Sequence, residues 1–277
     1  MTPPLVIKFG GELLEDATRM AAVVAAVADI AGGAHAPMVI VHGGGREIDA
    51  ALKTAGIEKR QVDGLRITDT ATLDIVVAVL AGAVNTRFVA GLGAAGVRAV
   101  GLTGADGGCG LSEPAPPHRT VDGQIVDLGK VGIPADQADM HLLKGLLRDG
   151  FVPVVASIGA DRDGGLLNVN ADTMAGHLAA RLGAARLVIA GSTPGVLDDA
   201  GATVPTLDPA AIARLVSGGT ATAGMIAKLR ACEHALRNGV DEVVIVDGRN
   251  RDALRAAASG AIPASATRVA TTAGIRS

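Results

Sequence analysis

Short apolar runs alternate along this chain with longer stretches rich in alanine and leucine. The short runs are apolar throughout, which is typical of strands buried on both faces of a parallel sheet. Strands separated in this way by helical stretches favour a mostly parallel sheet with helices on both faces. The sequence therefore predicts an α/β fold, a three-layer αβα sandwich around a mostly parallel central sheet. The expected strands are 5–9, 38–41, 99–102, 152–157, 187–190 and 242–246, and the expected helices are 17–30, 46–54, 72–92, 141–149, 171–182, 209–217, 225–238 and 251–258.

Two segments interrupt this alternation. Residues 106–133 hold a Gly-Gly pair, a proline-rich stretch and an Asp-Gly turn, which predict a β-hairpin excursion that covers a site. Residues 198–206 predict a second excursion. Residues 91–96 match the dinucleotide pattern G-x-G-x-x-G, but they close an expected helix instead of following a strand, so they are interpreted as a helix end. No repeat and no long linker divide the chain, so a single domain is expected over residues 1–277.

Composition excludes several classes of partner. The 277-residue chain has a net charge of −3, three Phe and no Tyr or Trp, so neither a basic surface nor a base-stacking platform for nucleic acid is expected. Cys109 and Cys232 do not have a metal-binding spacing and are interpreted as free thiols of a reducing compartment. No signal peptide and no uninterrupted apolar run of membrane-spanning length is recognised, so a cytoplasmic protein without membrane attachment is expected.

The first predicted strand contains a lysine and runs directly into a Gly-Gly turn, Lys8-Phe9-Gly10-Gly11. Burying an ammonium group costs several kcal/mol unless an anion offsets it. Glycines also let backbone N–H groups approach a ligand closely. The segment indicates a site for phosphate or for charge that develops during a reaction. A lysine that reaches solvent at a strand end remains an equal alternative at this point.

The second predicted strand ends in His42-Gly43-Gly44-Gly45 before a helix. Three glycines between a buried strand and a helix N-terminus are typical of an anion-binding turn. Because ligands bind at the carboxyl ends of parallel strands, the two glycine turns are expected at one edge of the sheet. Together they favour an anion site over two ordinary tight turns.

Three further segments carry isolated polar side chains. Asn168, Asn170 or Asp172 could cap the helix that follows them, and their alternation with apolar residues also indicates an edge that faces a ligand. Lys228 is expected in a first helical turn, where a bound phosphate would compensate the unfavourable helix dipole. From this segment alone, a solvated surface lysine is the favoured alternative. Arg66 lies in an apolar stretch and either binds a carboxylate or forms a surface salt bridge.

Taken together, these segments resemble the amino acid kinase family, and within it the kinases that phosphorylate N-acetylglutamate. The resemblance covers nearly the whole chain and rests on the order and spacing of its segments. These are Lys8-Phe9-Gly10-Gly11, His42-Gly43-Gly44-Gly45, Gly64-Leu65-Arg66-Ile67-Thr68-Asp69, Leu80-Ala81-Gly82-Ala83-Val84-Asn85, Asn168-Val169-Asn170-Ala171-Asp172 and Gly224-Met225-Ile226-Ala227-Lys228.

The resemblance implies transfer of the γ-phosphoryl group of ATP, with Mg²⁺, to the side-chain carboxylate of N-acetyl-L-glutamate, the second step of arginine synthesis. It implies that Lys8 contacts the transferred group, that Lys228 lies on the leaving side, and that Asp172 holds both lysines. The N–H groups of Gly11 and Gly44 would bind phosphoryl oxygens. The implied substrate residues are Gly44, Gly45, Arg66 (on the α-carboxylate) and Asn168; the implied nucleotide residues are Ser192, Thr193, Gly195, Val196, Leu197, Thr222, Gly224 and Met225.

The resemblance also implies an organisation. An N-terminal lobe of about residues 1–183 would bind the acyl amino acid, and a C-terminal lobe of about residues 184–277 would bind the nucleotide. No metal ligand is expected from the chain, because Mg²⁺ would be bound mainly through the nucleotide phosphates. A homodimer is expected through the long helix near residues 72–92. Because the chain starts at its first strand, inhibition by arginine is not expected.

The nucleotide side departs from the family pattern. Ser192 stands where an aspartate is expected, Ala223 where glycine or aspartate is usual, and the turn Gly104-Ala105-Asp106 lacks a frequent lysine. These changes predict altered nucleotide affinity. They also motivate one alternative, a non-catalytic ligand sensor, although retention of both lysines and Asp172 argues against it.

Another alternative is a kinase of the same fold that acts on free or carrier-linked aminoadipate in lysine synthesis. The Gly64–Asp69 segment favours the small acetylated substrate, and the net charge gives no basic docking surface for a carrier protein. A uridylate or carbamate kinase explains Arg66 and Asn168 together less well.

Overall fold

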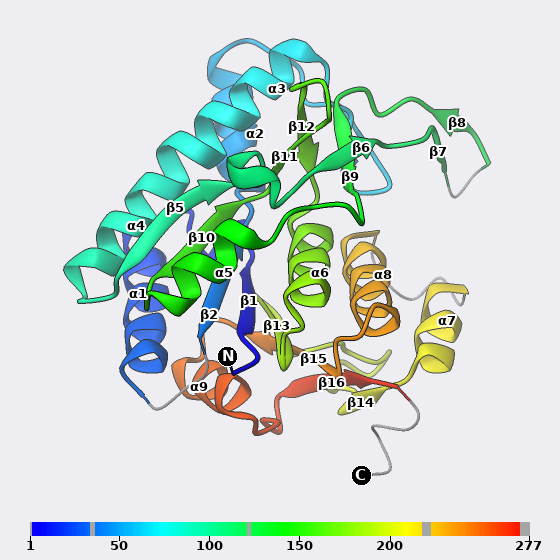
Figure 1. Ribbon diagram of the computed structural model, residues 1–277. Coiled ribbons are helices and arrows are strands. Elements are labelled where there is room, and N and C mark those ends of the chain that lie inside the picture. Colours follow the sequence, from blue (N-terminus) through cyan, green and yellow to red (C-terminus); the bar gives the residue numbers. More distant parts are fainter. Residues whose placement is uncertain (1, 34–36, 121–122, 218–222, 272–277) are drawn as a thin grey trace.

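The computed structural model describes residues 2–33, 37–120, 123–217 and 223–271 (Figure 1). Its largest sheet has eight strands in the order β14-β16-β15-β13-β1-β2-β10-β5. The six predicted strands are present and mutually parallel, so the mostly parallel sheet is confirmed. They are β1 (Leu5–Phe9), β2 (Met38–His42), β5 (Ala99–Thr103), β10 (Val152–Ala156), β13 (Arg186–Gly191) and β15 (Glu242–Asp247). Two further strands, β14 (Thr206–Leu207) and β16 (Ala266–Ala270), were not expected, and β16 runs antiparallel to β15.

Helices cover both faces of this sheet, which confirms the three-layer αβα sandwich (Figure 1). The predicted helices are all present, with ends that differ by at most two residues. One layer contains α1 (Ala17–Gly32), α4 (Asn85–Ala94) and α9 (Arg251–Ser259), joined by α2 (Gly45–Thr54) and α3 (Thr70–Val77). The other layer contains α5 (His141–Arg148), α6 (Ala171–Leu182), α7 (Pro209–Ser217) and α8 (Ala223–Arg237).

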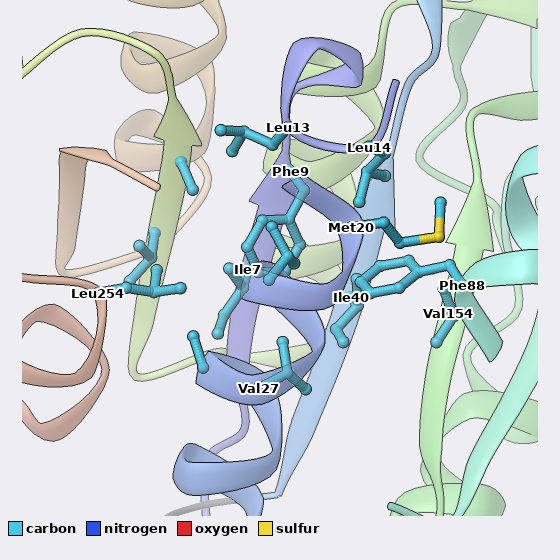
Figure 2. Close-up of a cluster of buried hydrophobic side chains, with 14 of the residues drawn as sticks. Ile7, Phe9, Leu13, Leu14, Met20, Val27, Ile40, Phe88, Val154 and Leu254 are labelled. Atoms are coloured by element: carbon cyan, nitrogen blue, oxygen red, sulfur yellow. The ribbon is translucent and has the colours of Figure 1, made fainter. Parts of the chain in front are cut away.

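Residues of β1 alternate between the two hydrophobic cores. Ile7 and Phe9 join the core on the α1 face, whereas Val6 joins the core on the α6 face. Figure 2 shows Phe9 among side chains from β2, α1 and the long helix, and its ring meets Phe88 edge to face at 5.9 Å. Burying one such side chain stabilises the fold by about 1.5–3 kcal/mol. The same alternation places Lys8 on the α6 face.

The long helix predicted near residues 72–92 extends over residues 70–94 and consists of three segments. Its middle, η2 (Ala78–Val84), is π-helical and separates α3 from α4. By length and composition alone, this helix could cross a membrane, and no other helix in the described ranges meets the same criteria. Val76, Leu80, Val84 and Phe88 nevertheless pack into the core beside α1, as side chains of a buried core helix do.

A smaller sheet lies beyond the carboxyl ends of β2, β10 and β5 (Figure 1). Its strand order is β11-β12-β9-β6. Two separate hairpins accompany it, β3–β4 and β7–β8. The predicted β-hairpin excursion at 106–133 is therefore confirmed and contains two strand pairs, whereas its role in covering a site stays a prediction. The bounds are β3 (Gln61–Val62), β4 (Leu65–Arg66), β6 (Ser112–Pro114), β7 (His118–Arg119), β8 (Ile125–Val126), β9 (Val131–Pro134), β11 (Ile158–Ala160) and β12 (Leu166–Val169).

The second predicted excursion and the predicted helix end at 91–96 are also confirmed. In the second excursion, the Asp198 carboxylate accepts hydrogen bonds from the N–H groups of Ala200 and Ala202, and Gly201 has a φ of 78°. The glycine-rich 91–96 segment ends α4 at Ala94, and Gly96 follows with a φ of 83°. Because this segment precedes β5 and does not open a helix, it lacks the context of a dinucleotide fingerprint.

Candidate active site

The glycine turns after β1 and β2 meet at the carboxyl edge of the sheet, as predicted. Phe9 pairs with His42 in register, so the two turns emerge side by side. A Cβ on Gly11 would lie 2.6 Å from the Gly44 Cα and 2.9 Å from the nitrogens of Gly44 and Gly45. A side chain at Gly11 therefore does not fit without moving backbone. Among the described residues, the N–H groups of Gly11, Gly44 and Gly45 have no acceptor, which leaves them available to an anion.

Lys8 and Asp172 form an ion pair beside these turns. Asn170 caps α6 by accepting hydrogen bonds from the N–H groups of Asp172 and Thr173, which settles the alternative among the three polar residues. Asp172 thereby enters the first turn of α6, and its Oδ1 lies 2.9 Å from the Lys8 Nζ. The two side chains are 10% and 11% exposed. The anion that a buried Lys8 requires is therefore supplied by α6.

This pairing keeps both groups charged. Burial alone would lower the pKa of Lys8. The negative charges of Asp172 and then of Glu12 outweigh this effect, so the pKa is raised above its ordinary 10.5. Burial alone would raise the pKa of Asp172, but Lys8 and Lys228 hold the pKa below its ordinary 3.8. Both groups are consequently ionised at neutral pH.

Lys228 reaches the same place from α8. Its Nζ lies 3.1 Å from the position that a Cβ on Gly191 would take, and the Glu12 Oε1 lies 3.4 Å from that position. Burial and the charge of Lys8 lower the pKa of Lys228 below 10.5, and Asp172 and Glu12 offset only part of this shift. Because α8 begins at Ala223, Lys228 lies in its second turn, so the expectation of a first-turn lysine was wrong.

Arg66 and Asn168 form a second group next to the Gly44–Gly45 turn. The Arg66 Nη2 pairs with Asp49 and lies 3.4 Å from the Gly45 carbonyl oxygen. Its Nη1 is buried and has no hydrogen-bond partner among the described residues. The Asn168 Nδ2 donates to the Thr68 hydroxyl at 3.1 Å, and that hydroxyl donates to the Arg66 carbonyl oxygen. A free guanidinium edge beside a fixed amide suits a small carboxylate ligand.

The segment predicted for the nucleotide follows β13, directly after Gly191. Ser192 and Leu197 are exposed and Thr193 is half-buried, while the Ser192 carbonyl oxygen accepts a hydrogen bond from Arg249 at 2.8 Å. Val196 is buried, and its N–H donates to the Thr267 hydroxyl.

Gly195 packs against the same threonine with a φ of 81°, so Gly195 and Val196 brace the turn on β16. Gly224 and Met225 lie at the start of α8, and Thr222 lies outside the described residues.

Several neighbours of the site were not recognised in the sequence. Glu12 directly follows the Gly10-Gly11 turn, and Asp49 orients Arg66 from the helix after the second glycine turn. Both positions adjoin recognised motifs, and that proximity was the available signal. Thr68 and Asn85 lie in recognised segments, but their side chains contact residues distant in sequence, so the segments alone gave them no role.

A model of the amino acid kinase family matches residues 3–247. The chain belongs to the amino acid kinase family. It is 44% identical over 220 residues to the acetylglutamate kinase of Novosphingobium aromaticivorans, which covers 76% of this chain and 72% of that one. It is 42% identical to the acetylglutamate kinase of Methanopyrus kandleri, over 87% of this chain and 94% of the relative.

Structural similarity agrees with this assignment. An N-acetylglutamate synthase from Neisseria gonorrhoeae, solved with coenzyme A and N-acetyl-glutamate, superimposes with a TM-score of 0.80. At 24% identity this likeness concerns the fold alone, and the chain spans 59% of the synthase's length. The amino acid kinase fold predicted from the six motif segments is thus confirmed.

The donor groups of this amino acid kinase site suit a metal carried by the nucleotide. Within the described residues, no group of three His, Cys, Asp or Glu side chains is arranged to hold a metal ion. Mg²⁺ commonly keeps several waters and binds through substrate phosphates and one or two carboxylates. Glu12 and Asp172 are the carboxylates beside the lysines. The residues present therefore fit a phosphate-borne ion and not a dedicated protein cage.

Proposed function

We propose that the protein transfers the γ-phosphoryl group of ATP to the side-chain carboxylate of N-acetyl-L-glutamate and forms N-acetyl-L-glutamyl 5-phosphate, the second step of arginine biosynthesis. The observation that carries the proposal is the convergence of Lys8, Lys228 and two N–H-lined glycine turns beside the free Arg66 edge. The acetylglutamate kinases at 42–44% identity support the choice of acceptor.

The reaction needs alignment and charge neutralisation. An oxygen of the substrate carboxylate attacks the γ-phosphorus, the bond between that phosphorus and the bridging oxygen of ADP breaks, and the electron pair leaves with ADP. The attacking carboxylate is already ionised at neutral pH, so no general base is required. Catalysis then rests on holding the reactants in line and on neutralising the charge that moves between them.

The surroundings of each residue support the role proposed for it. Lys8, fixed by Asp172, binds the transferred phosphoryl group, and Lys228 faces the leaving oxygen. The N–H groups of Gly11 and Gly44 bind phosphoryl oxygens as an oxyanion hole does.

On the acceptor side, Arg66 binds the α-carboxylate of the substrate, while Gly44, Gly45 and Asn168 bind the remainder. The buried Arg66 Nη1, which has no hydrogen-bond partner in the described part of the chain, supports this assignment.

The nucleotide is proposed to bind along Ser192–Leu197 and the start of α8, including Gly224 and Met225. Bound Mg²⁺ would neutralise part of the charge on the β- and γ-phosphates. We propose lobes of about residues 1–183 for the acyl amino acid and 184–277 for the nucleotide. Gly191, which adjoins both Lys228 and Glu12, lies just inside the second lobe.

A homodimer through the long helix is part of the proposal. The face of this helix that does not enter the core exposes small residues, among them Ala71, Ala78, Gly82 and Ala90, which permit close approach of a second helix. Light scattering should give twice the chain mass of 27.5 kDa, and a monomer or hexamer would contradict it. The proposed location is the cytoplasm, where the buried free thiols Cys109 and Cys232 stay reduced.

The activity is tested by mixing purified protein with MgATP, N-acetyl-L-glutamate and hydroxylamine, which traps an acyl phosphate as a hydroxamate that is detected as its coloured iron(III) complex. Hydroxamate is expected with N-acetyl-L-glutamate and strongly reduced with glutamate. Preference for aminoadipate would instead identify a kinase of lysine biosynthesis. Absence of turnover with every acceptor, together with tight binding of N-acetyl-L-glutamate, would identify a ligand sensor.

A further inference from the structure

His42 and Asn85 are fully or nearly fully buried polar residues next to the second glycine turn, and the mechanism above gives neither a role. His42 is 0% exposed and Asn85 is 5% exposed. The Asn85 Nδ2 lies 2.9 Å from the Val154 carbonyl oxygen and 3.0 Å from the His42 Nε2. The His42 Nδ1 lies 3.0 Å from the Gly43 carbonyl oxygen. These contacts connect β10, the long helix and the glycine turn.

The Val154 carbonyl oxygen begins this series of hydrogen bonds and determines the direction of each of them. The Val154 carbonyl oxygen can only accept, so Asn85 must present its NH₂ group there. The second hydrogen of that NH₂ group points to the His42 Nε2, which must therefore be the unprotonated nitrogen. Burial lowers the pKa of His42 to about 4, so the ring is neutral and its single proton is on Nδ1. His42 consequently donates to the Gly43 carbonyl oxygen.

Holding this carbonyl also determines the direction of the next N–H group. The Gly43 carbonyl and the Gly44 N–H belong to one planar trans peptide, in which the two groups point in opposite directions. The carbonyl faces the His42 ring, so the Gly44 N–H faces away from it. The Gly44 nitrogen lies on the Gly11 side of the turn, where the proposed phosphoryl site lies.

We propose that His42 and Asn85 are positioning residues that direct the Gly44 N–H into the phosphoryl site. The inference rests on the proposed function, because its catalytic consequence requires that this N–H binds the transferred group. Without the hydrogen bond from His42, two neighbouring glycines give the peptide little resistance to rotation. Part of the population would then present a carbonyl oxygen to the phosphoryl group, where it would repel negative charge.

Two substitutions at His42 distinguish its hydrogen bond to the Gly43 peptide from simple filling of the buried space. In His42→Asn the side-chain amide places an N–H donor near the former Nδ1 position, whereas His42→Leu fills the space without a donor. Both lose the acceptor for Asn85, so the difference between them reports the bond to Gly43. We expect His42→Asn to keep kcat within about tenfold of wild type. We expect His42→Leu to lower kcat by about 10²-fold, as loss of one oxyanion donor does, with both KM values changed less than threefold.

A spectroscopic measurement on the wild-type protein keeps the test independent of activity and of variant folding. Long-range ¹H–¹⁵N correlation spectra of the histidine-labelled protein should show His42 as the neutral Nδ1–H form. An Nε2–H form, equal losses in the two variants, or wild-type kcat in His42→Leu would overturn the inference. Failure of the proposed function can be distinguished from failure of this inference. In the first case the wild-type protein would show no turnover, while NMR could still determine the tautomer of His42.

Discussion

The two lysines of the active site have the same charge and different surroundings. Lys8 lies in a central strand, is paired with Asp172 at 2.9 Å, and has a raised pKa. Lys228 lies on α8, has no ion-pair partner among the described residues, and has a lowered pKa. The Lys8 side adjoins two tightly packed glycine turns, whereas the Lys228 side adjoins the exposed Ser192 segment.

The difference indicates two kinds of cation in the site. Lys8 is a permanent cation, whose charge is compensated by the fold, and Lys228 is a responsive cation, whose charge is fully compensated only when nucleotide binds. Asp172 holds Lys8 before substrates arrive, so in the proposed mechanism Lys8 would stabilise the transferred group without reorganisation. Lys228 is poorly compensated in the absence of nucleotide, since burial and the charge of Lys8 both oppose its ammonium form. Arrival of a phosphate supplies the missing anion. Binding of nucleotide should therefore raise the pKa of Lys228 and leave that of Lys8 little changed.

The largest effect is expected at the Lys8 ion pair. Lys8→Met removes the cation and leaves the Asp172 carboxylate buried, which should destabilise the fold by about 3 kcal/mol in urea unfolding. Activity should fall about 10²–10³-fold in the hydroxamate assay. The double variant Lys8→Met/Asp172→Asn is the matched control. It should recover stability without recovering activity, and recovery of both would show that the pair is only structural.

Lys228→Ala should lose about as much activity as Lys8→Met but no stability, because it removes a charge that the fold compensates poorly. The wild-type kcat/KM for ATP should fall as pH rises through the lowered pKa of Lys228 in the free enzyme, because the ammonium form is the active one. Lys228→Arg should lack this alkaline fall, since a guanidinium stays protonated. An alkaline limb that persists unchanged in Lys228→Arg would assign the titration to another group.

On the acceptor side, Arg66→Gln should raise the KM for N-acetyl-L-glutamate about 10–100-fold through loss of charge-assisted hydrogen bonds to the α-carboxylate. The KM for ATP should stay within threefold of wild type. Asp49→Asn keeps Arg66 but weakens its orientation and should have a smaller effect in the same direction. Equal changes in both KM values would contradict the separation of the two sides.

The smallest effect is expected from Ser192→Asp on the nucleotide side. Restoring the carboxylate that the family resemblance leads one to expect should lower the KM for ATP about fivefold, the effect of one additional hydrogen bond of about 1 kcal/mol. Steady-state kinetics with varied ATP measure this, and the KM for N-acetyl-L-glutamate serves as the internal control. An unchanged KM for ATP would indicate that Ser192 does not face the nucleotide.

The sequence predicted elements whose signals are local. The strand that carries Lys8, the helix behind Asp172 and the two glycine turns were each identified from a few adjacent residues. The antiparallel β16 was not, because its polar Thr267 and Arg268 obscure the apolar pattern and its pairing depends on distant strands. The contact between His42 and Asn85 spans 43 positions, and Asn85 directly follows a π-helical segment that no local pattern indicated.

Titration of the two lysine side chains tests the difference between Lys8 and Lys228 most directly. Heteronuclear NMR of lysine-labelled protein, with Lys8→Arg and Lys228→Arg used to assign the signals, should give Lys8 a pKa above 10.5 and Lys228 a pKa below it. Addition of a non-hydrolysable MgATP analogue should raise the pKa of Lys228 and leave that of Lys8 within about half a unit. Two equal pKa values, or a nucleotide-dependent shift at Lys8 alone, would contradict the division between a permanent and a responsive cation.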